Sequence, residues 1–322
     1  MKKEQIIELL RKDMRGEHQA IIQYLNHAYT LGEGEIACEI EAIAREEMRH
    51  LDWLADEIVE LGGDPSMERD PVDFEMVPPG ELLEKDIDLE QVAIDQYQEH
   101  MEAIDEPEIR RLLARIVHDE RAHQGQFRDL IEEAREQMEA GEPPDAEGEA
   151  PEDADYAKRL EEIMNEGIRH EYSVILQYLF HSFLAEDKEV AEELENAAIN
   201  EMQHMGWLAE EQYEHKGEPD YSHGDLVLSH DMVKNLLADI DVEAEVTEAY
   251  SSQLSELKEE DLRKLVERIR DHEIYHEAVF KDLLEEVKEE AEDASEQEQE
   301  EDGPGESAPR EIPSVGSLKD KE

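Results

Sequence analysis

The sequence has almost no cysteine and no long hydrophobic run. Cys38 is the only cysteine among 322 residues, which excludes an internal disulfide and any metal site built from Cys-x-x-Cys motifs. A chain without disulfides is typical of a reducing compartment. No stretch has the length and apolarity of a membrane-spanning helix, and residues 1–12, MKKEQIIELLRK, are too charged for a signal peptide. We therefore expect a soluble, cytoplasmic protein that does not bind membranes.

Basic residues are also scarce. Lysine and arginine total 31 against 91 aspartates and glutamates, which gives a formal net charge of −60. Nucleic acid and anionic lipid would be repelled at long range by such a surface, so both are excluded as partners. An acidic excess of this size suits concentrated salt, where counterions screen the self-repulsion. A halophilic source is the hypothesis that follows.

One stretch of the chain occurs twice. REEMRHLDWLA at residues 45–55 returns as INEMQHMGWLA at residues 199–209, and the recurrence continues on both sides with an offset of 154 that later becomes 153. A period of this length indicates duplication of a whole domain rather than a solenoid. We predict domains at 1–140 and 156–290, a Pro- and acid-rich linker at 141–155, and a disordered acidic tail at 291–322.

Each copy has four segments with a helical period near 3.6 and no alternating strand pattern. The predicted class is all-α, with helices near 3–31, 35–61, 81–105 and 107–140, and again near 156–185, 188–216, 229–257 and 259–290. Between the second and third helices of the first copy, residues 62–80 contain four prolines and are long enough to cross a bundle end to end. Each copy is therefore predicted to be a four-helix bundle with a long crossover between helices 2 and 3.

Glutamates recur at one fixed spacing around the predicted helical turns. In each of the four hairpins a glutamate is followed 30 residues later by a second glutamate, and a histidine follows that one by three. Residues equidistant from a turn lie at the same height, and an i, i+3 pair projects from one helix face. The residues so placed are Glu17, Glu47, His50, Glu90, Glu120 and His123 in the first copy, and Glu171, Glu201, His204, Glu243, Glu273 and His276 in the second.

Four buried carboxylates would repel one another strongly unless cations neutralised them. Four carboxylates and two imidazoles are the donor set of a dinuclear metal site. The alternative is a bundle with an apolar core and solvated acids, since Glu-x-x-His arises by chance in so acidic a chain. Its repetition in four hairpins at one spacing favours the metal site.

The stretch GEHQAIIQYLNHA at residues 16–28, followed by EEMRHLDWL and LGGDP, resembles the ferroxidase-centre helices of bacterioferritins within the ferritin-like di-iron carboxylate superfamily. The resemblance covers both copies. It implies two tandem ferritin-like bundles with two dinuclear iron centres. Terminal ligands would be Glu17 with His50, Glu90 with His123, Glu171 with His204 and Glu243 with His276; the bridges would be Glu47, Glu120, Glu201 and Glu273.

The same resemblance assigns two further pairs. Tyr24 and Tyr178, two helical turns after the first glutamate of each copy, would hydrogen-bond a ligand or donate an electron, with ordinary core packing as the alternative. Met48 and Met202 stand where bacterioferritins supply haem ligands from two subunits, so a duplicated chain could hold one haem between its domains. The favoured interpretation is that these methionines simply pack in the core.

The resemblance implies oxidation of Fe(II) by O₂ or H₂O₂ at one centre per repeat, serving iron handling or defence against oxidants. The alternatives are a manganese catalase that disproportionates peroxide and a non-catalytic metal-binding bundle. No fifth helix follows either copy, which favours an intrachain pseudo-dimer over a hollow shell and leaves further homo-oligomerisation open. Ala93 and Val246 stand where rubrerythrins carry an extra ligand, which argues against a peroxidase of that type.

Overall fold

The computed structural model describes residues 1–32, 34–140, 151 and 153–301, and within these it contains helices and no strand. The first four helices are α1 (Lys3–Leu31), α2 (Glu35–Glu60), α3 (Pro79–Ala103) and α4 (Pro107–Ala140). The second four are α5 (Ala154–Leu184), α6 (Lys188–Glu214), α7 (Met232–Gln253) and α8 (Glu260–Glu301). No helix in this part of the chain is long and apolar enough to cross a membrane.

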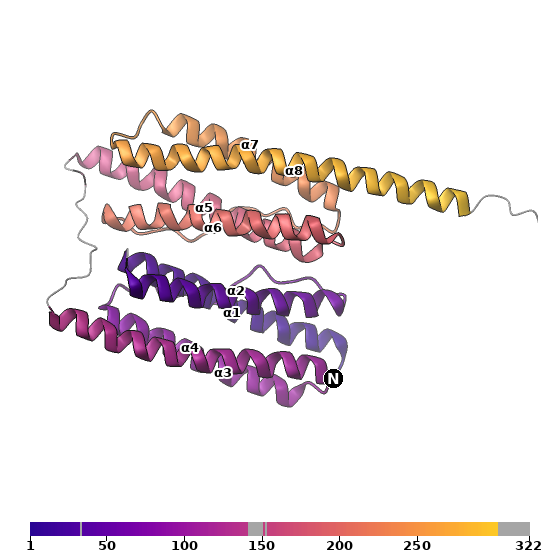
Figure 1. Ribbon diagram of the computed structural model, residues 1–322, viewed down its shortest axis with the longest axis horizontal. Coiled ribbons are helices and arrows are strands. Elements are labelled where there is room, and N and C mark those ends of the chain that lie inside the picture. Colours follow the sequence, from indigo (N-terminus) through magenta and orange to yellow (C-terminus); the bar gives the residue numbers. More distant parts are fainter. Residues whose placement is uncertain (33, 141–150, 152, 302–322) are drawn as a thin grey trace, which may run out of the picture.

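The helices form two four-helix bundles that lie one above the other in Figure 1. Consecutive helices pair as antiparallel hairpins, α1 with α2, α3 with α4, α5 with α6 and α7 with α8. Extended segments at 61–78 and 215–231 connect the second helix of each bundle to its third. The predicted all-α class and the two bundles with long crossovers are confirmed.

Short polar and glycine signals set the helix ends. Gly32 ends α1 with φ of 70°, a backbone conformation that side chains with a Cβ rarely adopt. Asp153, Asp187 and Asp231 precede α5, α6 and α7, and each side chain accepts a hydrogen bond from backbone N–H groups of the first turn. Pro79 begins α3, where the missing N–H costs nothing.

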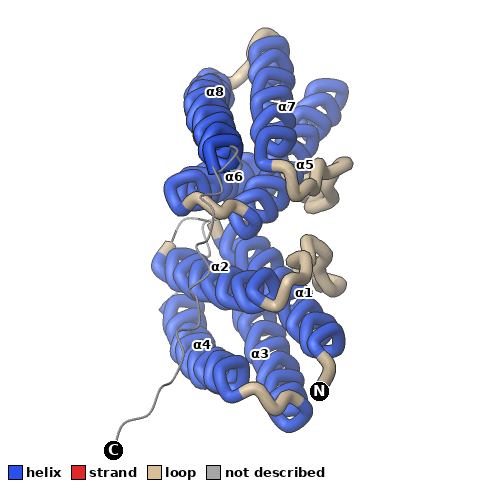
Figure 2. Tube along the Cα trace, turned by 90° about the vertical axis from the view of Figure 1, so that its right-hand side faces the viewer, coloured by secondary structure: helices blue, strands red, loops and turns tan. Residues whose placement is uncertain are grey.

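The two bundles meet through α1 and α2 of the first and α5 and α6 of the second, as both views show (Figures 1 and 2). A polar network crosses this contact. Arg69, from the first crossover, donates to the hydroxyl of Tyr172 at 3.0 Å and to the carbonyl of Tyr221 at 3.0 Å. Tyr172 in turn lies 2.8 Å from Nε2 of His18, and the hydroxyl of Tyr213 donates to Asn26 at 2.6 Å. These bonds connect the bundles at buried and partly buried positions.

The predicted terminal segments need one correction. Helix α8 continues to Glu301, so the predicted disordered tail is wrong for residues 291–301. The reason is composition, because the segment consists mostly of alanine, glutamate and glutamine, which have high helix propensity. The rest of that tail, and most of the predicted linker at 141–155, lie outside the described residues.

Candidate metal centres

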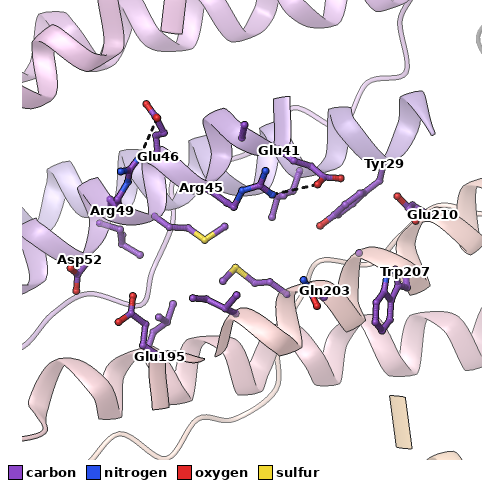
Figure 3. Close-up of a pocket in the computed structure, with 18 of the residues that line it drawn as sticks. Tyr29, Glu41, Arg45, Glu46, Arg49, Asp52, Glu195, Gln203, Trp207 and Glu210 are labelled. Carbon is purple, nitrogen blue, oxygen red and sulfur yellow. Dashed lines mark ion pairs between the residues drawn. The ribbon is translucent and has the colours of Figure 1, made fainter. Parts of the chain in front are cut away.

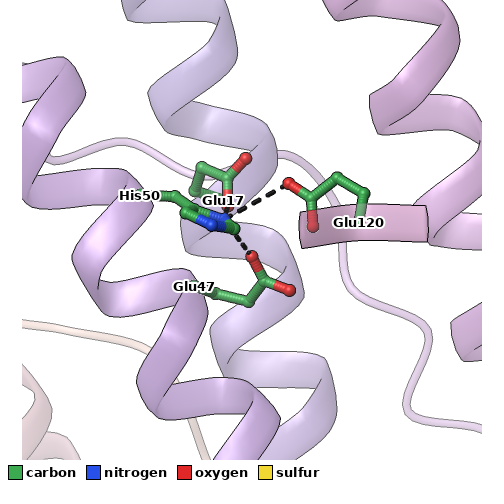
Figure 4. Close-up of side chains that lie close together, drawn as sticks. All are labelled: Glu17, Glu47, His50 and Glu120. Atoms are coloured by element: carbon green, nitrogen blue, oxygen red, sulfur yellow. Dashed lines mark hydrogen bonds and ion pairs between the residues drawn. The ribbon is translucent and has the colours of Figure 1, made fainter. Parts of the chain in front are cut away.

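In the first bundle each helix contributes to one buried cluster of carboxylates and imidazoles. Glu17 comes from α1, Glu47 and His50 from α2, Glu90 from α3, and Glu120 and His123 from α4. They form two overlapping groups of four that share Glu47 and Glu120, and within each group one donor atom per residue lies within 4.8 Å of the others. Figure 4 shows one group, with the side chains of Glu17, Glu47 and Glu120 surrounding the imidazole of His50.

The distances divide the glutamates into two kinds. Nδ1 of His50 lies 2.7 Å from Glu47, 3.3 Å from Glu120 and 3.5 Å from Glu17. Nδ1 of His123 lies 2.8 Å from Glu47, 3.1 Å from Glu120 and 3.4 Å from Glu90. Glu47 and Glu120 thus face both imidazoles, whereas Glu17 and Glu90 face one each. This is the arrangement that two bridging and two terminal carboxylates need.

The second bundle repeats the arrangement. Nδ1 of His204 lies 2.6 Å from Glu201 and 3.0 Å from Glu273. Nδ1 of His276 lies 2.5 Å from Glu201, 3.5 Å from Glu273 and 3.7 Å from Glu243. Glu171 completes the group around His204. All twelve residues of the two clusters are at most 3% exposed.

Every glutamate that faces one imidazole also accepts a hydrogen bond from a buried tyrosine. Tyr24 donates to Glu90 at 2.8 Å, and Tyr178 donates to Glu243 at 2.5 Å. In the same way Tyr97 donates to Glu17 and Tyr250 to Glu171. Tyr24 and Tyr178 were expected at the site from the sequence, whereas Tyr97 and Tyr250 were not assigned a role. Their signal was present, because Tyr97 follows Glu90 by the same seven residues that separate Tyr24 from Glu17.

Burial and crowding change the acid–base properties of the clusters. Burial, with the nearby charges of Glu47 and Glu120, raises the pKa of Glu17 and of Glu90 well above the usual value. Burial would also raise the pKa of Glu47, but the interactions with the His123 and His50 imidazoles outweigh it and the pKa falls.

The pKa values of the imidazoles change in the direction opposite to that which burial alone would produce. Burial would lower the pKa of His204 and His276, but the carboxylates around them raise it, to about 11 and about 9 respectively. Without metal, the raised pKa of the imidazoles favours their positive form, which offsets the negative charge of the nearby carboxylates.

Several buried donor atoms have no hydrogen-bond partner although they lie close to one another. They are Oε1 of Glu47 and Glu120 in the first bundle, and Oε2 of Glu171 and Glu243, Oε1 of Glu201 and Glu273, and Nδ1 of His276 in the second. Nδ1 of His276 and Oε1 of Glu201 are only 2.5 Å apart, yet neither has a hydrogen-bond partner. These atoms belong to two carboxylates in the first bundle and to four carboxylates and one imidazole in the second, and lone pairs that converge in this way on a common space fit cations.

A separate cavity of about 720 Å³ lies between the bundles, lined by α1 and α2 on one side and by α5 and α6 on the other. Met48 and Met202 are both among its lining residues. Figure 3 shows two sulfur atoms projecting into it from opposite walls, with the guanidinium groups of Arg45 and Arg49 on the α2 side. Met202 also packs in the hydrophobic core, with Met48 partly buried beside it. The two methionines therefore pack against the core and line a cavity together.

Fold and clusters together define a class of protein, the helical-bundle dinuclear carboxylate proteins. A family model described as a ferritin-like domain matches residues 7–136. A bacterioferritin from Desulfovibrio desulfuricans is 35% identical over 130 residues, which cover 38% of this chain and 72% of that protein. The chain belongs to the ferritin-like superfamily of di-iron proteins, and within it is similar to bacterioferritin.

A solved structure is also similar. It is the X-ray structure of the Desulfovibrio desulfuricans bacterioferritin, with its diiron site in different catalytic states. The match has 29% sequence identity and a TM-score of 0.41, and covers 47% of this chain and 95% of that one. The sequence match with that bacterioferritin covers 38% of this chain, so the two bundles fit a duplicated domain.

Proposed function

We propose that each bundle binds two iron ions and oxidises Fe(II) with O₂ or H₂O₂. The observation that carries this proposal is the convergence of four carboxylates and two imidazoles, with unsatisfied buried oxygens, in both bundles. Two divalent cations would balance the four negative charges of one cluster. When bound, two Fe(II) ions supply two electrons, which with two protons convert O₂ to H₂O₂, or H₂O₂ to two molecules of water.

The distances in the first bundle suggest which side chains would bridge the two ions and which would bind only one of them. Glu47 and Glu120 would bridge the two ions, and His50 and His123 would each bind one of them through Nδ1. Glu17 and Glu90 would complete the two ligand sets, oriented by the hydroxyls of Tyr97 and Tyr24. Burial of the cluster keeps bulk water away and strengthens every charge interaction in it.

Fe(II) oxidation by a double variant tests the proposal. Glu47→Ala with Glu201→Ala removes one bridging carboxylate from each bundle, so we expect the initial rate of Fe(III) formation to fall at least about 100-fold. The matched control is Glu39→Ala with Glu192→Ala, two exposed glutamates on the same helices, α2 and α6. An unchanged rate in the first variant would show that the assigned centres are wrong.

The identity of the metal is tested by elemental analysis of protein purified without added metal. Full occupation of both centres by iron predicts about four iron atoms per chain. Manganese in that ratio, together with disproportionation of peroxide, would favour the manganese catalase instead. Metal in that ratio without turnover of Fe(II) or peroxide would favour a non-catalytic bundle.

We propose in addition that the cavity between the bundles takes a haem, which Met48 and Met202 would hold through its iron. The cavity's volume of about 720 Å³ is in the range of cofactor pockets, and the two thioethers enter it from different bundles. Arg45 and Arg49 line the same cavity and would pair with the haem propionates. Because both bundles contribute a ligand, the two repeats would act as an intrachain pseudo-dimer.

The haem proposal is tested by growth with added haem precursor and by the absorption spectrum of the purified chain. We expect a Soret band and one haem per chain. Met48→Leu with Met202→Leu keeps the volume of both side chains, and should abolish the bisthioether spectrum without changing the thermal unfolding midpoint. A colourless wild-type protein after supplementation would remove the idea.

A further inference from the structure

The two clusters contain the same four glutamates and two histidines. The groups that face the outer nitrogen, Nε2, of these histidines differ between the clusters. In the first bundle Nε2 of His123 lies 2.9 Å from Oε2 of Glu46, and Nε2 of His50 lies 3.6 Å from Oδ2 of Asp119. In the second bundle Nε2 of His204 lies 2.8 Å from Nδ1 of His272, with the rings 5.1 Å apart. For Nε2 of His276, the described residues include no carboxylate within ion-pair distance.

These differences fall at equivalent positions of the repeat. The offset of 154 places Asn200 where the first copy has Glu46, and the offset of 153 places His272 where it has Asp119. Both changes put an uncharged residue at a position whose carboxylate, in the first copy, faces the outer nitrogen of an imidazole. The twelve glutamates and histidines of the clusters are of the same residue type at equivalent positions. The two copies therefore differ in the residues that contact the proposed ligands, and not in the ligands themselves.

The group that contacts one ring nitrogen of an imidazole determines how strongly the other nitrogen donates its lone pair to a metal. When Nδ1 faces a metal, Nε2 carries the proton, and a carboxylate that accepts this N–H fixes the tautomer and makes the ring a better ligand. A neutral imidazole such as His272 can accept the same N–H, but it adds no negative charge. Loss of such an outer carboxylate typically reduces metal affinity about 10- to 100-fold.

Nearby arginines reduce this difference in negative charge between the two bundles but do not remove it. Arg49 pairs with Glu46 at 3.0 Å, and its counterpart in the second copy is Gln203, so the added charge of Glu46 is partly balanced. Arg115 lies over the ring of Trp53 at 4.1 Å, and Arg268 lies over Trp207 at 4.3 Å, so this cation is common to both copies. What remains specific to the first bundle is a carboxylate near each outer nitrogen, at 2.9 Å from His123 and at 3.6 Å from His50.

We propose that the two centres are not equivalent, and that the first bundle binds divalent metal more tightly and fills before the second. Glu46 and Asp119 are the positioning residues that strengthen metal binding in the first bundle. Asn200 and His272 stand at the same positions in the second bundle and leave its metal binding weaker. The inference rests on the proposed function, because it assumes that both clusters are metal centres.

Anaerobic calorimetric titration of the metal-free full chain with Co(II) tests the order. We expect two classes of site, each taking two ions, with affinities that differ by about tenfold or more. Glu47→Ala should leave only the weaker class, and Glu201→Ala only the tighter one. The exchange Asp119→His with His272→Asp should narrow or reverse the difference.

A matched control keeps the charge change but moves it away from the clusters. Asp129→His lies further along α4 at an exposed position, and should leave both classes as in the wild type. Asp119→Asn is a second, nearly isosteric variant for use where the histidine exchange disturbs folding, and it should weaken the tighter class.

The possible outcomes separate this inference from the proposed function. Four Co(II) ions bound in one class, or two classes that do not change in the exchange and Asp119→Asn variants, would overturn the ordering and leave two metal centres in place. Failure to bind Co(II) at all would overturn the proposed function and the ordering with it.

Discussion

At the scale of single residues, the hydroxyls of Tyr97 and Tyr250 are the contacts that hold Glu17 and Glu171 in place. Both donors are buried and come from a different helix than the glutamate they orient. Tyr97→Phe with Tyr250→Phe removes a donor to a buried carboxylate while keeping the ring, so the glutamate becomes a less well-oriented ligand.

We expect this double variant to bind Co(II) about tenfold more weakly in both bundles, with little change in helix content. Calorimetric titration measures the affinity and circular dichroism measures the helix content. Tyr29→Phe is the control, because its hydroxyl lies against Gly206 at the bundle contact and Tyr29 is not among the residues of either cluster. Wild-type affinity in Tyr97→Phe with Tyr250→Phe would mean that packing alone positions the glutamates.

His18 gives a pH dependence whose sign follows from its surroundings. Burial, followed by weaker effects that include the positive charge of Arg69, lowers the pKa of His18 to about 4. In the unfolded chain the same imidazole has a pKa near 6.5, so the unfolded state binds the extra proton first as the pH falls. The stabilisation from neutral His18 is therefore complete above pH 6.5 and is lost between about pH 6.5 and 4.

The measurement is the free energy of unfolding of the metal-free chain at several pH values in that window. We expect His18→Gln, which cannot titrate, to lose less stability on acidification than the wild type, by at most about 3 kcal/mol. The carboxylates titrate in both proteins, so the difference between the two curves isolates His18. Parallel curves would contradict the assignment of a neutral, buried imidazole.

At the scale of helices, the sequence was sufficient for most of the architecture. Apolar periodicity, Gly32 and the prolines of the crossover placed seven of the predicted helices within about four residues of the observed bounds at both ends. The fixed spacing of Glu and Glu-x-x-His predicted which twelve residues the bundles bring together. These features depend on neighbours in sequence or on the geometry of one hairpin.

Features that depend on contacts between hairpins or bundles could not be predicted in this way. The partner of Tyr97 lies on α1, and His272 meets His204 across two helices, so neither contact follows from local spacing. The cavity beside Met48 exists only because the two bundles face each other through particular helices. The end of α8 follows from helix propensity, which a search for apolar periodicity does not detect.

Gly206 tests the helix packing at the bundle contact. A Cβ added there would lie 2.8 Å from the hydroxyl of Tyr29 and about 3 Å from its ring, so α1 and α6 would have to separate or Tyr29 would have to turn. We expect Gly206→Ala to reduce the free energy of unfolding by about 1–3 kcal/mol despite the better helix propensity of alanine.

The matched control is Gly125→Ala in α4. A Cβ at Gly125 has nothing within 4 Å, so alanine should stabilise the chain by about 0.5–1 kcal/mol. Denaturant unfolding of both variants under the same conditions gives the comparison. Equal effects of the two substitutions would show that the contact between α1 and α6 is not tight at this point.

At the scale of the whole molecule, the net charge of −60 opposes folding through repulsion among surface carboxylates. Many of these carboxylates are exposed. Salt screens the repulsion between exposed charges over the Debye length, which is about 10 Å in 0.1 M salt and about 3 Å in 1 M salt. Salt should therefore relieve most of the repulsion in the folded chain, where the charges are closest.

We expect the thermal unfolding midpoint of the metal-free chain to rise by about 5 °C or more between 0.1 M and 2 M KCl. Sucrose at equal osmolality is the control, since it stabilises compact states by exclusion from the surface without screening charge. A rise in KCl that exceeds the rise in sucrose would support the halophilic hypothesis. A midpoint that does not depend on KCl, or that rises equally in sucrose, would mean that the acidic surface serves solubility rather than stability in salt.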